Sequence, residues 1–333
     1  MVLSIVVPVY NVEKYLAECL DSLLCQNVEK NEYEIICIDD KSTDNSTEII
    51  ERYIKTNGNI KLIRLPENKG VSAARNAGIY DAKGDYVWFV DSDDFIAPNC
   101  LKDIFFSIKS DNADTLFVKP ISFKDGIDTS IYKGNDVKED ETTEKYSEWL
   151  WTRIIKRKLL TEHNVYFDEG VYLSEDNLFC SVLNKYVLST CNYDKACYFY
   201  RIRENSLSTS AGKEKLNRLI ISAKNINEAI KSKRVEEESL TQDVYNYVIM
   251  VLFEYSKMPY FKSKRKIKEL KTLNVFPLKD YNHRFYEYGD KDNEDQKKLI
   301  DLKNKCYTVK GYKRLRHFRF WLKIKRKLGR IFK

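Results

Sequence analysis

The sequence predicts an α/β fold in which a doubly wound, mostly parallel sheet is followed by a helical C-terminal extension. Short apolar runs alternate with stretches of helical periodicity as far as Lys119. The first of these runs, residues 3–9, is almost continuously apolar, as in a strand that is buried on both faces. From Lys213 to Lys305 the chain is rich in lysine and glutamate at helical spacing, which indicates the extension.

The expected elements follow one another in a regular order along the chain. Asn11 is expected to cap a helix whose apolar residues recur at helical spacing from Tyr15 to Leu24. The other expected strands are 34–38, 60–65, 86–90 and 115–119, and the other helices are 46–55, 71–82 and 98–110. After a polar loop at 124–145, helices are expected at 149–160 and 175–185, and a further strand within 187–200.

The charge of the chain divides it into a slightly acidic body and a basic tail. Residues 310–333 contain eleven basic residues and no acidic one, and the rest of the chain carries 46 basic residues against 50 acidic ones. Apolar residues of the tail, including Phe318 and Trp321, recur near helical spacing, which predicts an amphipathic helix on an anionic membrane surface. A nucleic-acid-binding tail or a helix packed on the body are the alternatives. Since the body is not basic, no nucleic-acid partner is expected.

We therefore expect three regions: an α/β domain at 1–210, a helical extension at 211–309 and the basic tail at 310–333. The eight cysteines include no C-x-x-C pair, so buried free thiols in a reducing compartment are expected rather than disulfides or zinc. No targeting segment is visible, and no apolar run approaches the ~18 residues that span a bilayer. The expected location is the cytoplasm, peripheral to the inner face of the cell membrane.

Polar clusters follow three of the expected strands, where ligands bind in open α/β sheets. They are residues 8–11, residues 39–44 and residues 91–94. Each alone is common turn chemistry, but three clusters that meet at one sheet edge indicate a ligand site. Neither G-x-G-x-x-G after the first strand nor G-x-x-x-x-G-K-[ST] occurs, so the dinucleotide-binding and P-loop interpretations lose their mechanism.

Asp91 and Asp93 are the most informative pair in these clusters. Two carboxylates at this spacing on a sharp turn can reach one Mg²⁺ or Mn²⁺ ion, which prefers oxygen ligands and completes its shell with diphosphate and water. The alternative is a solvated turn that caps the helix beginning at Pro98.

These motifs resemble those of family 2 glycosyltransferases, which have the GT-A fold. The resemblance covers roughly residues 3–210, in the order and spacing of the family. The segments that carry it are residues 4–11, 38–46, 68–78, 84–94 and 174–179.

On the donor side, the resemblance implies a nucleobase pocket lined by Pro8, Tyr10 and Asp40, with Asp40 accepting a hydrogen bond from a uracil-type imide. Lys41 stands where the family usually has glycine. Arg75 matches a position beside the nucleotide, and a surface ion pair is its alternative.

The resemblance also assigns the Asp-x-Asp turn. Asp91 matches the ribose or diphosphate side of the metal motif and Asp93 the direct ligand of Mn²⁺ or Mg²⁺. Asp94 could instead support these residues or cap a helix.

On the acceptor side, Glu175 and Asp176 match the acidic pair of the family, and Asp176 would be the general base. From the residues alone, an acidic pair that opens a helix is a cap. Arg201 and Arg203 resemble the basic segment that closes over the diphosphate; ordinary strand-face charges are the alternative.

The implied function is an inverting, metal-dependent transfer of a sugar, most simply from a UDP-sugar, to a hydroxyl of a lipid-linked or growing surface glycan. Two alternatives are a sugar nucleotidyltransferase and a degenerate transferase that only recruits partners. The first lacks its glycine-rich triphosphate loop, and the intact Asp91, Asp93 and Asp176 argue against the second. The sequence leaves the sugar, the linkage, the acceptor and the oligomeric state open.

Overall fold

The computed structural model describes residues 1–129, 149–171 and 175–203, together with Ile221, Asn225 and Ser232. Almost all of them belong to the first of the two units into which the chain divides, Met1–Ser210. The expected helical extension and basic tail lie outside the described residues, apart from those three positions, and stay predictions.

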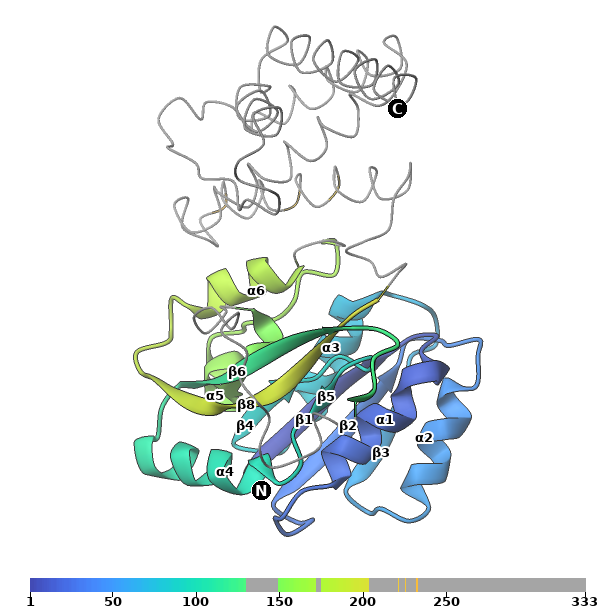
Figure 1. Ribbon diagram of the computed structural model, residues 1–333. Coiled ribbons are helices and arrows are strands. Elements are labelled where there is room, and N and C mark those ends of the chain that lie inside the picture. Colours follow the sequence, from blue (N-terminus) through green and yellow to red (C-terminus); the bar gives the residue numbers. More distant parts are fainter. Residues whose placement is uncertain (130–148, 172–174, 204–220, 222–224, 226–231, 233–333) are drawn as a thin grey trace, which may run out of the picture. The chain divides into compact units, whose positions relative to one another are not determined.

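Within the described residues, eight strands form one mixed sheet in the order β3-β2-β1-β4-β7-β6-β8-β5 (Figure 1). Its first four strands are mutually parallel, β6 is parallel to β8, and β7 and β5 run antiparallel to their neighbours. The strands are β1 (Leu3–Val9), β2 (Tyr33–Asp39), β3 (Ile60–Arg64), β4 (Tyr86–Phe89), β5 (Phe95–Ile96), β6 (Thr115–Lys124), β7 (Arg153–Lys156) and β8 (Thr190–Ile202).

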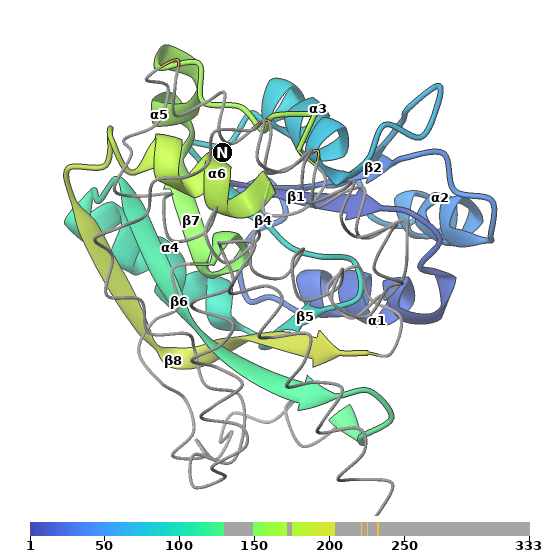
Figure 2. The same ribbon diagram turned by 90° about the horizontal axis from the view of Figure 1, so that it is seen from above.

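Helices cover both faces of the sheet, as a doubly wound fold requires (Figure 2). One face carries α1 (Glu13–Leu24), α2 (Ser46–Ile54) and α4 (Cys100–Asp111), and the other carries α3 (Val71–Asp81), α5 (Arg157–Glu162) and α6 (Glu175–Leu183). Alternate residues of β1 supply both cores, with Ile5 and Val7 facing the first set and Val6 the second. The prediction of a doubly wound α/β sheet is confirmed.

Gly78 allows α3 to lie unusually close to the sheet. A Cβ at this position would come within 2.3 Å of a methyl group of Val6. Because the contact is with a fully buried strand residue, a larger side chain would push α3 outward. This helix carries Arg75, so its close packing helps to set the height of that side chain above β1.

Two of the expected elements are wrong in detail. The helix expected at 149–160 is instead a 3₁₀ turn, η2 (Leu150–Thr152), followed by β7 and the short α5. Ile154 and Ile155 pair with β4 on one side and β6 on the other. These residues form a strand because this pairing, and not the helical spacing of a short apolar run, determines their structure.

Asn11 does not cap α1. It adopts a left-handed conformation at φ 48°, and its Oδ1 accepts a hydrogen bond from Thr43 N at 2.8 Å. The first turn of α1 is satisfied from the loop before α2, where Ser46 Oγ accepts from Val12 N at 3.0 Å and Asp44 Oδ2 accepts from Glu13 N at 3.0 Å.

The seven cysteines among the described residues are free, and five of them are buried, as expected; Cys25 is exposed. In this described part, no helix has the length and apolar character needed to cross a bilayer.

Candidate active site

The carboxyl ends of β1, β2 and β4 meet at one edge of the sheet, as their order predicts. Val9 lies opposite Asp39 in the parallel ladder, and Asp40 N donates to Val9 O at 2.8 Å. Pro8 is buried at the end of β1, whereas the next residue but one, Tyr10, is half exposed. The structure therefore places the predicted nucleobase-pocket residues next to one another, with Tyr10 exposed and Pro8 and Asp40 buried.

Asp40 is buried and holds the loop that precedes α3. Its two oxygens accept hydrogen bonds from Lys69 N at 2.7 Å and Gly70 N at 2.8 Å. Burial raises the pKa of Asp40, and these two hydrogen bonds oppose the rise. Carboxylate oxygens can each accept a second hydrogen bond, so the predicted contact with a nucleobase is compatible with this role. Lys41, at the position where the family usually has glycine, is left-handed at φ 64°.

Arg75 joins the two acidic motifs of the site. Its Nη2 donates to Asp91 Oδ1 at 3.0 Å and its Nη1 donates to Glu175 Oε1 at 2.9 Å. The side chain is only 7% exposed and lies over the ring of Phe167. Arg75 is therefore a buried bridge between residues 84 positions apart, and the alternative of a surface ion pair does not hold.

The acidic turn after β4 is fixed by the carboxylate of Asp94. Tyr198 OH donates to Asp94 Oδ2 at 2.8 Å, and Arg201 N donates to Asp94 Oδ1 at 2.7 Å. The same Tyr198 hydroxyl accepts a hydrogen bond from Asp91 N at 3.1 Å. Asp94 thus supports the turn and caps no helix, since α4 begins after Asn99 without a side-chain cap.

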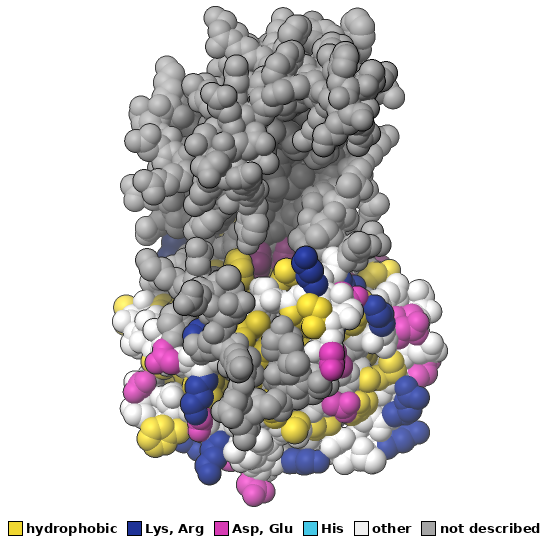
Figure 3. Space-filling model, in the orientation of Figure 1, with side chains coloured by type: hydrophobic (Ala, Val, Ile, Leu, Met, Phe, Trp, Pro, Cys, Tyr) yellow, Lys and Arg dark blue, Asp and Glu magenta, His cyan; other side chains and the backbone are white. Residues whose placement is uncertain are grey.

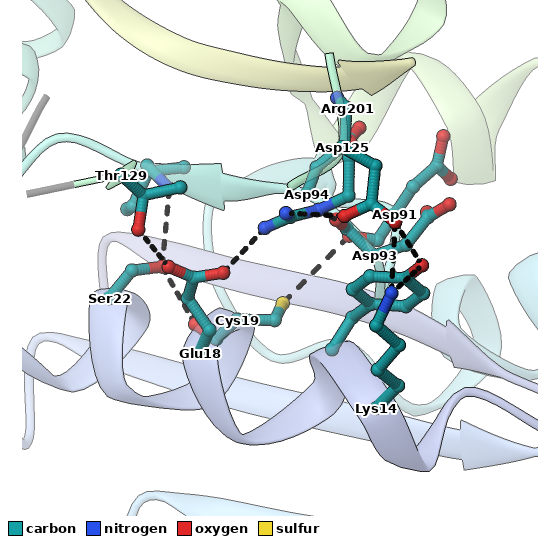
Figure 4. Close-up of polar contacts among 12 residues, drawn as sticks. Lys14, Glu18, Cys19, Ser22, Asp91, Asp93, Asp94, Asp125, Thr129 and Arg201 are labelled. Carbon is teal, nitrogen blue, oxygen red and sulfur yellow. Dashed lines mark hydrogen bonds and ion pairs between the residues drawn. The ribbon is translucent and has the colours of Figure 1, made fainter. Parts of the chain in front are cut away.

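Three carboxylates, those of Asp91, Asp93 and Asp94, lie close together on this turn (Figure 4). Burial raises the pKa of Asp94 well above its ordinary value, and repulsion from Asp93 and Asp91 adds to the effect. The pKa of Asp93 is also raised, chiefly by burial, although Arg203 lowers it. Crowded carboxylates of this kind favour a bound cation, because its positive charge offsets both the burial of their negative charges and their mutual repulsion.

Arg201 is enclosed by acceptors from three segments (Figure 4). Its Nε donates to Asp93 O at 2.9 Å, and its guanidinium pairs with Glu18 of α1 and with Asp125, which follows β6. Only 5% of the side chain is exposed. A contact between Arg201 and a diphosphate, which the resemblance implies, would have to form at a side chain that these partners already enclose.

Arg203 differs from Arg201 in its surroundings. Its Nε lies 2.5 Å from Asp93 Oδ2, and its side chain is 31% exposed. The guanidinium also lies over the ring of Tyr15, 5.5 Å from the centroid. Of the two predicted arginines, Arg203 is the one that solvent reaches.

Glu175 and Asp176 open α6 and face the same arginine. Burial raises the pKa of Glu175 to about 7, with a contribution from Asp176, while Arg75 opposes the rise. The pKa of Asp176 is raised as well, again chiefly by burial. Asp176 Oδ1 accepts a hydrogen bond from Asn177 N at 2.8 Å, and no ion pair holds its carboxylate among the residues described. Glu175 is therefore held by a charged partner, Arg75, whereas the carboxylate of Asp176 is not paired with a cation among the residues described.

Three residues of this site were not found from the sequence: Glu18, Asp125 and Tyr198. Glu18 reads as an ordinary polar position of α1, and Asp125 falls in a segment that reads as loop. Their contacts with Arg201 depend on which strands pair, so local spacing holds no signal for them. Tyr198 stands in the aromatic and basic segment that was singled out, but its bond to Asp94 needs the tertiary structure.

The site fits a divalent cation by its donor set. Among the described residues, no group of three or more His, Cys, Asp or Glu side chains is arranged to hold a metal ion. Mg²⁺ and Mn²⁺ commonly take one or two protein carboxylates and complete their shell with substrate phosphates and water, which matches Asp91 and Asp93. The guanidinium of Arg203 at Asp93 also marks a position where a positive charge is favourable.

The surface around this unit carries charges of both signs. Figure 3 shows basic and acidic side chains interspersed on the visible face of the described part. The strong bias toward one sign that the sequence shows is confined to residues 310–333.

A doubly wound sheet with an Asp-x-Asp turn at its carboxyl edge, tied by one arginine to a second acidic pair, defines a transferase of the GT-A type. The chain belongs to glycosyltransferase family 2: the family model "Glycosyl transferase family 2" matches residues 4–172.

Similar proteins are bacterial glycosyltransferases. A poly(ribitol-phosphate) beta-glucosyltransferase of Bacillus spizizenii is 34% identical over 246 residues, which are 71% of this chain and 38% of that protein. The poly(ribitol-phosphate) beta-N-acetylglucosaminyltransferase TarS of Staphylococcus aureus is 35% identical over 219 residues, 63% of this chain and 37% of that protein. This chain thus matches less than two fifths of the length of either relative.

A solved structure shows the same fold. The crystal structure of S. aureus TarS 1-349 in complex with UDP-GlcNAc has a TM-score of 0.65 and 26% sequence identity, and the comparison covers 98% of this chain and 92% of that one. The expected family and the GT-A-like fold are confirmed.

Proposed function

We propose that this protein transfers a sugar from a UDP-sugar, with inversion at the anomeric carbon, to a hydroxyl group of a surface polymer built from alditol phosphate. The observation that carries the proposal is the bridge made by Arg75. It holds Asp91 of the donor-side turn and Glu175 of the acceptor-side pair on one guanidinium, at 3.0 and 2.9 Å. A donor at the turn and an acceptor at the pair would then lie side by side.

On the donor side, Pro8, Tyr10 and Asp40 would receive the nucleobase. Mn²⁺ or Mg²⁺ would be held by Asp93 together with Asp91, and when bound it would neutralise the charge that develops on the leaving diphosphate. Asp94 and Tyr198 hold the turn in place for this purpose.

Asp176 is the proposed general base. It would take the proton of the acceptor hydroxyl while that oxygen attacks the anomeric carbon from the face opposite the diphosphate. The bond between the anomeric carbon and the diphosphate oxygen breaks, and UDP leaves. The raised pKa of Asp176 makes this carboxylate a better proton acceptor than an exposed aspartate. Glu175, held by Arg75, would orient the pair.

The names of the relatives support the acceptor class. Two of them are described as acting on poly(ribitol-phosphate), and a solved relative is in complex with UDP-GlcNAc. The basic tail at 310–333 would keep the protein near an anionic membrane surface, where lipid-linked polymers are built.

The experiment that tests the proposal is a nucleotide-release screen with UDP-, GDP- and dTDP-sugars, with Mn²⁺ present, with and without poly(ribitol phosphate). Release of UDP that depends on the polymer is the expected result. Asp93→Asn should abolish it. Asp103→Asn is the matched control, because this exposed aspartate of α4 pairs with Lys195 of β8, outside the site. Nucleotide release from GDP- or dTDP-sugars alone would contradict the proposed donor, and release without any dependence on the polymer would contradict the proposed acceptor.

A further inference from the structure

Two arginines contact Asp93 in different ways. Arg201 binds the main-chain oxygen of Asp93, and Arg203 pairs with its carboxylate. The first contact fixes the turn, and the second neutralises the side chain that is the proposed ligand of a cation. A cation at Asp93 would compete with Arg203 for the charge of this carboxylate, so binding of either one weakens binding of the other.

The surroundings of the two side chains show which of them can move. Arg201 has acidic partners from α1 and from the segment after β6, and 5% of it is exposed. Arg203 is 31% exposed and packs on the face of Tyr15. Asp93 itself is 19% exposed, so solvent ions can reach the pair. The more exposed Arg203, rather than the enclosed Arg201, is therefore the side chain that can leave Asp93.

A divalent cation at Asp93 would repel the neighbouring guanidinium, because like charges at this range interact strongly at a partly buried site. The same cation brings a diphosphate, which offers an arginine more negative charge than Asp93 does. The displaced side chain then finds a new partner within the same site.

We propose that Arg203 is an exchangeable counter-ion of the donor site: it neutralises Asp93 before a divalent cation is bound, and it passes from Asp93 to the donor diphosphate when the cation arrives. This inference rests on the proposed function, since it takes Asp93 as the cation ligand and a nucleoside diphosphate as the leaving group.

The exchange predicts effects of opposite sign in one variant. Without nucleotide, Arg203→Gln removes a competitor, so Mn²⁺ alone should bind about fivefold more tightly or better, the scale of a part-exposed ion pair. With saturating Mn²⁺ present, UDP should bind the same variant about fivefold more weakly or worse, because the diphosphate loses a charged partner. A residue that only stabilised the turn would weaken both.

The measurements are free Mn²⁺ by electron paramagnetic resonance and UDP affinity by calorimetry, both on the full chain. Lys14→Gln is the matched control: it removes one positive charge from the same cluster, but Lys14 pairs with Asp125 and not with Asp93. Its Mn²⁺ affinity should stay within about twofold of the parent protein. Arg203→Lys, which keeps the charge, should restore most of the UDP affinity.

Three results would overturn the exchange. The first is Arg203→Gln binding Mn²⁺ no more tightly than the parent protein, and the second is an equal gain in Lys14→Gln. The third is unchanged UDP affinity in Arg203→Gln. If the parent protein binds UDP with Mn²⁺ and only these variant effects are missing, the exchange fails and the proposed function stands. If the parent protein does not bind UDP with Mn²⁺, both fail.

Discussion

Arg75→Gln should destabilise the protein by about 3 kcal/mol near pH 8, because it leaves two carboxylates without the guanidinium that pairs with both. The side chains of Arg75, Asp91 and Glu175 are 7%, 27% and 14% exposed, so the pairs are largely shielded from water. Breaking a buried ion pair by removing one partner costs about 3–5 kcal/mol, and the access of water to Asp91 favours the lower figure. The loss is smaller than a typical domain stability of about 5–15 kcal/mol, so the variant should fold.

The stability that Arg75→Gln loses should be smaller at lower pH. Burial raises the pKa of Glu175 to about 7, above its ordinary value of 4.5, and Arg75 opposes this rise. A raised carboxyl pKa means that the folded state binds more protons than the unfolded state, so stability falls as pH rises from 4.5 through 7. Without Arg75 the pKa of Glu175 rises further, and the fall extends above pH 7. Near pH 5 Glu175 is protonated in both proteins, so the difference between them should be smaller by about 1 kcal/mol or more.

Urea unfolding at pH 5 and pH 8 measures this, with Lys61→Gln as the matched control. Lys61 also bridges two carboxylates, those of Glu34 and Asp81, but away from the site. Hydrogen bonds to Lys61 and other donors lower the pKa of Glu34 despite its burial, so it stays ionised at both pH values. The control should lose similar stability at pH 5 and pH 8. A loss below about 1 kcal/mol for Arg75→Gln, or a loss equal at the two pH values, would refute the assigned role of the bridge.

Three further expectations concern separate parts of the chain. Lys41→Gly should leave stability unchanged or raise it by up to about 1 kcal/mol in urea unfolding, since the residue is left-handed at φ 64°, whereas Lys41→Val should lose stability; a gain in the valine variant would speak against backbone strain. Chelation of divalent cations, or Asp93→Asn, should sharply reduce UDP affinity in calorimetry, and undiminished binding would remove the metal role of Asp93. Truncation after Val309 should abolish sedimentation with anionic liposomes, and salt should weaken binding of the full chain; equal sedimentation of the truncated chain would place the membrane contact elsewhere.

The first half of the fold could be predicted from the sequence because its strands are buried on both faces. Each of β1, β2 and β4 is a short apolar run followed at once by polar residues, and these signals are local. The rest depended on pairing between distant segments. Ile154 and Ile155 are in a strand because β4 and β6 flank them, and β5 has only two residues. Such contacts leave no periodicity along the chain.

The candidate site was likewise only partly predictable from the sequence. The turn at Asp91–Asp93 could be predicted from its place directly after a strand. The pair at Glu175 and Asp176 was assigned through the family resemblance alone, since an acidic pair that opens a helix otherwise indicates a cap. The connection of the two motifs through Arg75 was not predicted, since it spans 84 positions between Asp91 and Glu175. The predicted contact of Arg201 with a diphosphate remains untested, and its bonds to Glu18 and Asp125 give that side chain a structural role which spacing along one strand does not indicate.

The central claim, that this is an inverting transferase with its base at Asp176, is tested most directly by Asp176→Asn. Polymer-dependent release of UDP and the affinity for UDP should be measured on the same preparation. Turnover should fall by at least about 100-fold, because a general base contributes roughly 10²–10⁴-fold, while UDP affinity should change by less than about 1 kcal/mol. Glu175→Gln is the comparison. Near-normal turnover in Asp176→Asn with an inactive Glu175→Gln would move the base to Glu175, and normal turnover in both would contradict an acidic base at the start of α6.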